Sequence, residues 1–180
     1  MMKFPLFATT LFALLPTLSL ADSSRPFLLR VPKDLSSPCA GMLVRVNRDA
    51  KFSPLQIGTK EAGKPWVAIF KAGSGNTPLG EVVDAKTGDN LMLQPSHGTP
   101  WYYADVGKPG GFFDPMRMAT HEGWNLTTID TDHGRKNVLR RHTAEAQWAA
   151  TPMKDGAWRI GYNGRTEGDS PNFDMEVIYI

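Results

Sequence analysis

Short apolar runs alternate along the chain with breaks that contain glycine or proline. No run between residues 22 and 180 keeps the 3.6-residue apolar spacing of a helix over three turns, because Gly or Pro recurs about every ten residues. Segment 143–150, "TAEAQWAA", has the best helical composition but is too short to form an isolated helix. Short strands separated by turn signals predict an all-β sandwich or barrel. The predicted strands are 27–31, 42–46, 66–70, 81–85, 90–93, 101–106, 126–130, 137–141, 158–162 and 175–180.

A spacing of about 48 residues recurs within this pattern. The blocks "GMLVRVNRDAKF", "NLMLQPSHGTPW" and "NVLRRHTAEAQW" begin at Gly41, Asn90 and Asn137, and each reaches an aromatic residue 11 positions later. Two turns also match, "VVDAKTG" from Val82 and "TIDTDHG" from Thr128. Three copies of one unit in a single domain predict a β-trefoil with three repeats of about 48 residues. A two-sheet β-sandwich is the alternative.

Residues 1–21 have the pattern of a secretory signal peptide. Lys3 gives a positive start, an apolar run extends from Phe4 to Leu20, and Ser19-Leu20-Ala21 is a small-x-small cleavage site. We therefore expect a secreted, extracellular protein whose mature chain, residues 22–180, is a single all-β domain. Its 159 residues can bury about two thirds of the surface that the unfolded chain exposes.

The charge balance argues against polyanionic partners. Without Lys3 the chain keeps 19 basic and 18 acidic residues, and this near-neutral balance predicts no binding to nucleic acid and no membrane association of the mature form. The one dense basic run, 134–142, is flanked by Asp130, Asp132 and Glu145. We interpret it as a solvated strand face.

Cys39 is the only cysteine, so the chain cannot form an intrachain disulfide. A lone cysteine in a secreted protein is buried, paired with another molecule, or a reactive thiol, and the sequence leaves these three alternatives open. Asn125-Leu126-Thr127 is an N-glycosylation sequon, and Asn125 is therefore a predicted glycosylation site.

The polar motifs do not have the spacing of a metal, phosphate or catalytic site. A calcium loop that begins at Asp84 would place Lys86 and Pro95 where oxygen ligands are needed. The histidines lack a zinc spacing, and His121-Glu122 has no further ligand nearby in the sequence. Cys39 matches no catalytic cysteine context. We therefore expect a protein that is not an enzyme and that needs no metal and no cofactor. The four histidines are His97, His121, His133 and His142.

Aromatic residues are the other candidates for ligand contact, as a platform for sugars. Trp101 and Trp148 occupy equivalent positions in the predicted repeat, which places them in the shared core. Tyr102 and Trp124 are better surface candidates. The remaining members of this aromatic set are Trp66, Tyr103 and Trp158.

The segment "VVDAKTGDNLMLQPSHGTPWYYADV" resembles the Kunitz (soybean-type) β-trefoil protease inhibitors, with Val82, Asp84, Gly88, Tyr102 and Tyr103 at the matching positions. In that family the motif opens the domain, and the family's disulfides are missing here. Domain size and the absence of disulfides are similar to those of the mycocypins, fungal trefoil inhibitors of papain-like cysteine proteases. A secreted chain of this kind also resembles a fungal effector delivered to the plant apoplast.

The resemblance implies where a protease would bind. Soybean-type inhibitors use the loop between the fourth and fifth strands, here 71–80, and mycocypins use loops of the first repeat, here 34–41 and 59–65. The expected function is inhibition of a papain-like cysteine protease, an extracellular protein partner. A carbohydrate-binding, lectin-like or cell-wall-associated protein is the alternative. The predicted binding residues are Ser36, Ser37, Pro38, Cys39, Ala40, Gly41, Gly73, Ser74, Gly75 and Asn76.

Overall fold

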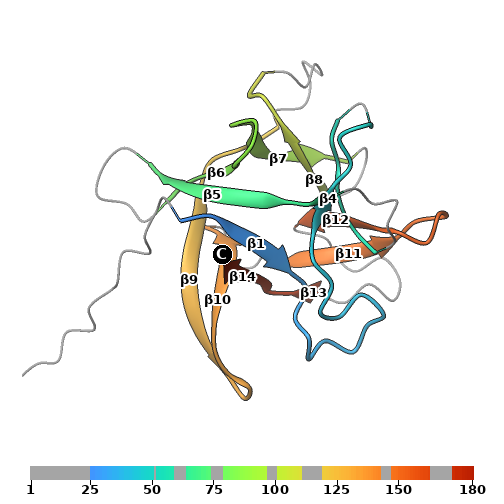
Figure 1. The fold of residues 1–180 in the computed structure, drawn as a ribbon, viewed down its shortest axis with the longest axis vertical. Coiled ribbons are helices and arrows are strands. Elements are labelled where there is room, and N and C mark those ends of the chain that lie inside the picture. The colour runs from blue at the N-terminus through green and yellow to red at the C-terminus, as the bar shows by residue number, and fades with distance from the viewer. Residues whose placement is uncertain are drawn as a thin grey trace, which may run out of the picture.

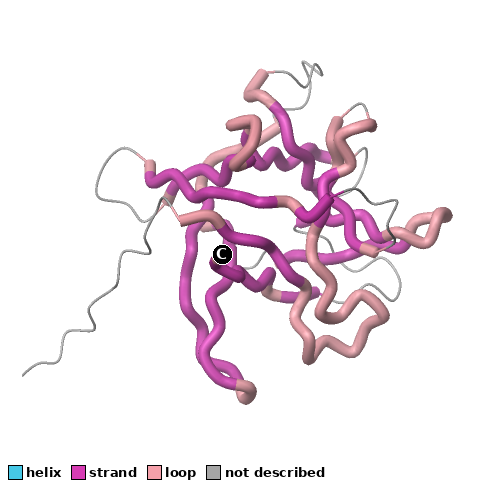
Figure 2. Tube along the Cα trace, viewed as in Figure 1, coloured by secondary structure: helices cyan, strands magenta, loops and turns pink. Residues whose placement is uncertain are grey.

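The computed structural model describes residues 25–50, 52–58, 64–73, 79–96, 101–110, 119–142, 147–162 and 172–180. These residues form strands, turns and loops (Figures 1 and 2), which confirms the all-β prediction. The described part of the chain contains no helix, and so none long and apolar enough to cross a membrane. The predicted signal peptide lies outside the described residues.

All ten predicted strands overlap an observed strand, and four strands were missed. The missed strands are β3, β4, β11 and β13. The strands are β1 (Phe27–Arg30), β2 (Arg45–Val46), β3 (Leu55–Ile57), β4 (Lys64–Pro65), β5 (Val67–Ala72), β6 (Gly80–Asp84), β7 (Asn90–Pro95), β8 (Tyr102–Gly107), β9 (Trp124–Thr131), β10 (Gly134–Arg141), β11 (Trp148–Pro152), β12 (Trp158–Tyr162), β13 (Asn172–Phe173) and β14 (Met175–Tyr179).

The strands form one antiparallel sheet that follows a path from β4 to β9. Within it, β1, β5, β6, β9, β10 and β14 each pair with two other members of this group. The link between β6 and β9 is the single residue pair Gly80–Trp124. The other links are longer, and the β9–β10 hairpin alone has eight residue pairs.

Three hairpins, β2–β3, β7–β8 and β11–β12, lie against one another. Strand β12 pairs with both β3 and β8, and an isolated bridge joins Pro54 to Asp105. The sequence blocks that suggested the repeat do not begin at equivalent places, because Asn90 opens β7 whereas Asn137 lies inside β10. The 48-residue repeat therefore stays a prediction.

An aromatic cluster fills part of the core. The rings of Trp124 and Trp148 stack with centroids 5.4 Å apart, and Tyr162 meets both edge-on. Trp148 is 1% exposed, as predicted for a core residue, and its indole N–H donates to the Leu139 carbonyl at 2.7 Å. The prediction of Trp124 as a surface residue is wrong, because it is 0% exposed. Trp124 is the first residue of β9, and its ring is covered by the stacked ring of Trp148.

Candidate functional site

Loop 32–41 connects β1 to the segment that leads into β2, and its backbone is fixed by turn hydrogen bonds. The Ser37 N–H donates to the Leu35 carbonyl at 2.9 Å, and the Ala40 N–H donates to the Ser37 carbonyl at 3.0 Å. Gly41 closes the loop, with its N–H 3.1 Å from the Val31 carbonyl. Its φ of 74° lies in the left-handed region, which explains why glycine occupies this position.

The predicted binding residues of this loop differ in how much they are exposed. Cys39 is 0% exposed, and its sulfur lies 3.1 Å from the Ser37 hydroxyl, so the buried alternative is the one that the structure supports. Because it packs into the core cluster, Cys39 anchors the loop and does not present a contact surface. Ser36 and Pro38 are exposed, and Ser37, Ala40 and Gly41 are partly buried.

The second predicted loop is only partly described. Gly73 is exposed, and its N–H donates to the Leu79 carbonyl at 2.9 Å. This backbone hydrogen bond closes the base of the loop. Ser74, Gly75 and Asn76 lie outside the described residues, as do residues 59–63 of the third implied loop.

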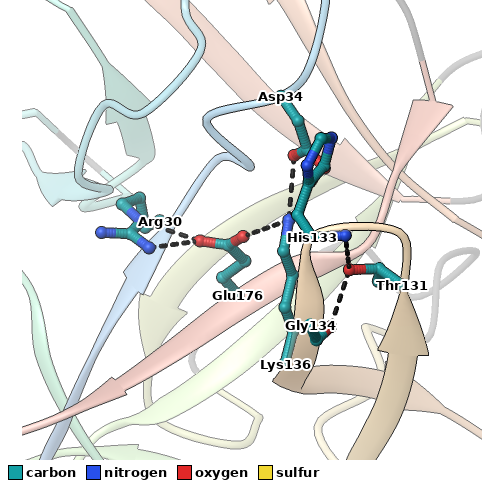
Figure 3. A network of polar contacts seen from close by, with 7 residues as sticks. All are labelled: Arg30, Asp34, Thr131, His133, Gly134, Lys136 and Glu176. Atoms are coloured by element: carbon teal, nitrogen blue, oxygen red, sulfur yellow. Dashed lines mark hydrogen bonds and ion pairs between the residues drawn. The ribbon is translucent and has the colours of Figure 1, made fainter.

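A chain of ion pairs ties the first loop to the sheet (Figure 3). Lys136 of β10 donates to both carboxylate oxygens of Asp34 at 2.9 Å, and its Nζ lies 3.0 Å from Oε1 of Glu176 on β14. Arg30 of β1 donates to Oε2 of the same Glu176 from Nε at 2.8 Å, and His133 Nε2 lies 3.7 Å from Asp34. One lysine thus connects the loop to two strands.

The contacts within the network favour the charged forms of Asp34 and Lys136. The hydrogen bond from Lys136 holds the pKa of Asp34 below its usual value, against a smaller opposing effect of burial. Burial alone would lower the pKa of Lys136, but the hydrogen bonds to Asp34 and Glu176 outweigh it, so the Lys136 pKa is raised. The Asp34–Lys136 pair therefore persists throughout the neutral pH range.

A pocket of about 240 Å³ lies between this loop and strands β9, β10, β13 and β14. Its carboxylates are already paired, since Asp174 binds Arg140 through two hydrogen bonds of 2.7 and 2.8 Å, and Asp34 and Glu176 bind Lys136. Such a pocket suits an apolar group of a partner better than a free cation. Its apolar walls come from Leu35, Ile129, Val138 and Phe173.

Sequence reasoning missed this network. Lys136 lies in the basic run interpreted as a solvated face, yet its side chain is only 18% exposed. The period of two along β10 was the available signal, because it places Lys136 on the same face as buried Val138. No sequence pattern linked Lys136 to Asp34, which is 102 residues away.

Aromatic side chains gather elsewhere, at the start of β8, where they lie against Gly161 and Arg159 of β12. The Trp101 ring lies against the backbone of Gly161, where a Cβ atom would come within 2.2 Å of it. Tyr103 is 37% exposed, meets Trp101 edge-on at 6.5 Å, and has the Arg159 guanidinium 5.0 Å from its ring centre. Arg159 also pairs with Asp105, whose pKa burial raises to about 6. Trp101, predicted in the core, is thus only partly buried.

Asn125, the predicted glycosylation site, is the second residue of β9 and is paired with Arg140 of β10. Its side chain is partly buried. Glycosylation at this position stays a prediction.

One group of described residues has the composition of a metal site. Glu81, His121 and Glu122 place one ligand atom each within 4.8 Å of one another. From the sequence, only the pair His121-Glu122 was visible, because the third member, Glu81, lies 40 positions before His121.

The positions that carry the resemblance to soybean-type inhibitors all lie in β6, β8 and the turn after β6. Val82 and Asp84 are buried, Gly88 lies in the turn, and Tyr102 and Tyr103 open β8. No protein-family model matches the chain, and a search of curated proteins finds no match. The resemblance therefore stays a prediction.

Proposed function

We propose that this protein is a secreted, non-enzymatic inhibitor of a papain-like cysteine protease, acting as an extracellular effector through loop 32–41. The supporting observation is that this loop combines an exposed tip with a fixed backbone. Ser36 and Pro38 face solvent, while turn hydrogen bonds and the Asp34–Lys136 pair hold the loop in place. A loop that is already ordered loses little conformational entropy on entering a protease cleft, which favours tight binding.

We further propose that the scaffold is a β-trefoil. The six strands that each pair with two others, together with the three mutually paired hairpins, support this arrangement. The hairpins begin at Arg45, Asn90 and Trp148, so the units would be 45 and 58 residues apart and unequal in length. Interstrand nuclear Overhauser effects on both sides of the Gly80–Trp124 pair would support it, and their absence would favour an open sheet.

The pocket beside the loop adds a second contact. Its apolar walls adjoin Leu35, which lies at the base of the exposed tip and packs partly against the core. An apolar side chain from the rim of the protease cleft would fill this pocket while the tip enters the cleft. Burial of one such side chain contributes about 1.5–3 kcal/mol to binding.

Inhibition assays test the proposal directly. The mature protein, residues 22–180, is incubated with panels of papain-like and trypsin-like proteases, and residual activity is measured. We expect inhibition of papain-like enzymes at micromolar concentration or below. No inhibition by micromolar protein across both panels would overturn the proposal, and inhibition of trypsin-like enzymes alone would reassign the target class.

Loop variants test the role of preorganisation. Replacing Ser36 and Pro38 together with glycine removes tip contacts and stiffness, and we expect inhibition to weaken at least about tenfold. Lys136→Ala leaves the tip unchanged but releases Asp34, with an expected loss of about fivefold to tenfold. Lys86→Ala, in the β6–β7 turn at the opposite end of the molecule in Figure 1, is the control and should inhibit like the wild type. Unchanged inhibition by both loop variants would exclude loop 32–41 as the contact.

A second candidate function, carbohydrate binding, is favoured by the Trp101–Tyr103 surface. The exposed Tyr103 ring, the adjoining Trp101 ring and the Arg159 guanidinium combine apolar faces with a hydrogen-bond donor, as sugar recognition requires. A glycan array distinguishes the candidates. Glycan binding that is lost in Tyr103→Ala and retained in the Ser36/Pro38 glycine variant would favour this function, and an array without any binder would exclude it.

A further inference from the structure

We propose that Glu81, His121 and Glu122 form a binding site for a divalent transition-metal ion, with Zn²⁺ as the best fit. The site is independent of loop 32–41 and of the proposed inhibition. It also departs from the expectation of no metal, because the third ligand becomes visible only when β6 lies beside the segment that leads into β9.

The fold holds the two segments in place on both sides of the cluster. Gly80, next to Glu81, pairs with Trp124, which is two residues after Glu122. Thr120, next to His121, exchanges two backbone hydrogen bonds with Leu93 of β7, at 2.8 and 3.1 Å. The three ligands are thus carried by backbone that hydrogen bonds already hold in place, which reduces the entropy cost of binding an ion.

The separations of the imidazole nitrogen from the two carboxylates match those between ligands of one metal ion, and the two carboxylates have oxygens within 4.8 Å of each other. His121 Nε2 lies 3.4 Å from Oε1 of Glu81 and 3.6 Å from Oε1 of Glu122. Two ligands with zinc bonds of about 2.1 Å at a tetrahedral angle are about 3.4 Å apart. A charge-assisted hydrogen bond would instead bring nitrogen and oxygen to about 2.7–2.9 Å. The imidazole nitrogen therefore lies as far from each carboxylate oxygen as two ligands of one metal ion lie from each other.

Charge and exposure also suit a cation. Among the described residues, neither Glu81 nor Glu122 forms a side-chain ion pair with a lysine or arginine, although Lys71 lies opposite Glu81 in the β5–β6 pairing. Asn90 donates its amide N–H to Oε2 of Glu81 at 3.1 Å, which orients the carboxylate and leaves Oε1 turned toward His121. The side chains are 24% to 76% exposed, so an ion and a completing water can enter from solvent.

The chemistry of the donors selects the metal. One imidazole nitrogen with two carboxylate oxygens is a donor set typical of Zn²⁺ and neighbouring transition ions, whereas Ca²⁺ takes six to eight oxygen ligands.

Calorimetric titration of the metal-free mature protein with ZnCl₂ tests the proposal. We expect one ion per chain with micromolar affinity, a shift of the His121 ring resonances in NMR spectra, and no comparable binding of Ca²⁺. His121→Ala and Glu81→Gln should each weaken Zn²⁺ binding at least about tenfold. His133→Ala, which removes another exposed histidine, is the matched control and should bind like the wild type.

The competing interpretation is a protonated His121 that is ion-paired with the two glutamates. It predicts no saturable Zn²⁺ binding below millimolar concentration, and that result would overturn the proposal. Zinc binding that survives in His121→Ala but is lost in His133→Ala would do the same. Circular dichroism of each variant confirms that a loss of binding is not a loss of fold.

Discussion

Two turns of this molecule share one sequence pattern but are stabilised in opposite ways. In both, an aliphatic residue is followed by an aspartate and, four positions later, by a glycine: Asp84 with Gly88 between β6 and β7, and Asp130 with Gly134 between β9 and β10. The side chain of Asp84 is 1% exposed, whereas that of Asp130 is 86% exposed. The comparison shows that the turn pattern alone does not decide what its aspartate does.

Asp84 is the centre of the first turn. Its Oδ2 accepts the indole N–H of buried Trp66 at 2.8 Å and pairs with Arg48, while its Oδ1 accepts the backbone N–H groups of Lys86 and Thr87 at 2.8 and 2.9 Å. The strands on either side contribute little, because β6 and β7 share only the residue pair Val83–Asn90. The hydrogen bonds of one buried carboxylate therefore hold this turn in place of a long series of interstrand backbone hydrogen bonds.

The second turn depends on its ladder. Eight residue pairs join β9 and β10, and the hairpin extends away from the rest of the molecule in Figure 1. The Thr131 hydroxyl donates to the Gly134 carbonyl at 2.7 Å and accepts the His133 N–H at 3.2 Å, so the turn is closed without the aspartate. Among the described residues, the ion-pair partner of Asp130 is the exposed Arg135, at 3.4 Å.

The largest predicted effect is that of removing the buried carboxylate. Asp84→Ala leaves Arg48 without its partner and the Trp66 indole N–H buried without an acceptor, and we expect a loss of about 3–5 kcal/mol of unfolding free energy. Asp130→Ala is the matched control and should change stability by less than about 0.5 kcal/mol. Urea unfolding measures both. Equal effects of the two substitutions would refute the contrast between the turns.

Acidification should remove the contribution of Asp84 to stability. Burial would raise the pKa of Asp84, but the hydrogen bonds from the Thr87 N–H, Arg48 and the Lys86 N–H outweigh it, so its pKa lies below the ordinary value of 3.8. A carboxylate with a lowered folded pKa contributes stability above its unfolded pKa and loses it as the pH falls toward the folded pKa. Unfolding free energy measured between pH 6 and pH 2 should therefore fall more steeply in the wild type than in Asp84→Asn. Parallel curves would contradict this.

The glycines should behave alike, because they serve the backbone and not the side-chain contacts. Gly88 and Gly134 have φ values of 74° and 99°, and a Cβ atom at either would meet nothing within 4 Å. Each Gly→Ala substitution should therefore cost about 1–2 kcal/mol through backbone strain alone. A much larger cost at one glycine in thermal unfolding would indicate that the two turns differ in backbone as well.

The smallest predicted effect is that of the exposed ion pair in the second turn. Arg135→Ala removes a pair whose members are 78% and 86% exposed, and we expect a change of less than about 0.5 kcal/mol in urea unfolding. A loss of more than about 1 kcal/mol would mean that the hairpin depends on its surface charges as well as on its ladder.

Local composition predicted strands well where one face of the strand is apolar and failed where pairing overrode it. Segment 143–150 looked helical, yet its residues 148–150 begin β11, because Trp148, Ala149 and Ala150 are buried and paired with β12. Helix propensity differs among residues by less than about 1 kcal/mol, which tertiary burial readily exceeds. The missed strands β4 and β13 have only two residues each, too few for any periodic signal.

The candidate sites were predictable only in part. Loop 32–41 was identified from its Pro, Ser and Gly content, but Lys136, which binds its Asp34, comes from β10 and is itself paired with Glu176 of β14. The cluster around His121 was missed for the same reason, since Glu81 belongs to another strand.

The sequence by itself determined the strand-rich class, the position of most turns and the prediction of a secreted chain without disulfides, because these depend on local composition and on spacing along the chain. Only the tertiary structure decided that Asp84 is buried while Asp130 is exposed, that Cys39 is an anchor, and that Lys136 joins Asp34 to Glu176. Each of these depends on residues that are distant in the sequence and adjacent in space. Burial and electrostatic pairing depend on distance in space and not on distance along the chain.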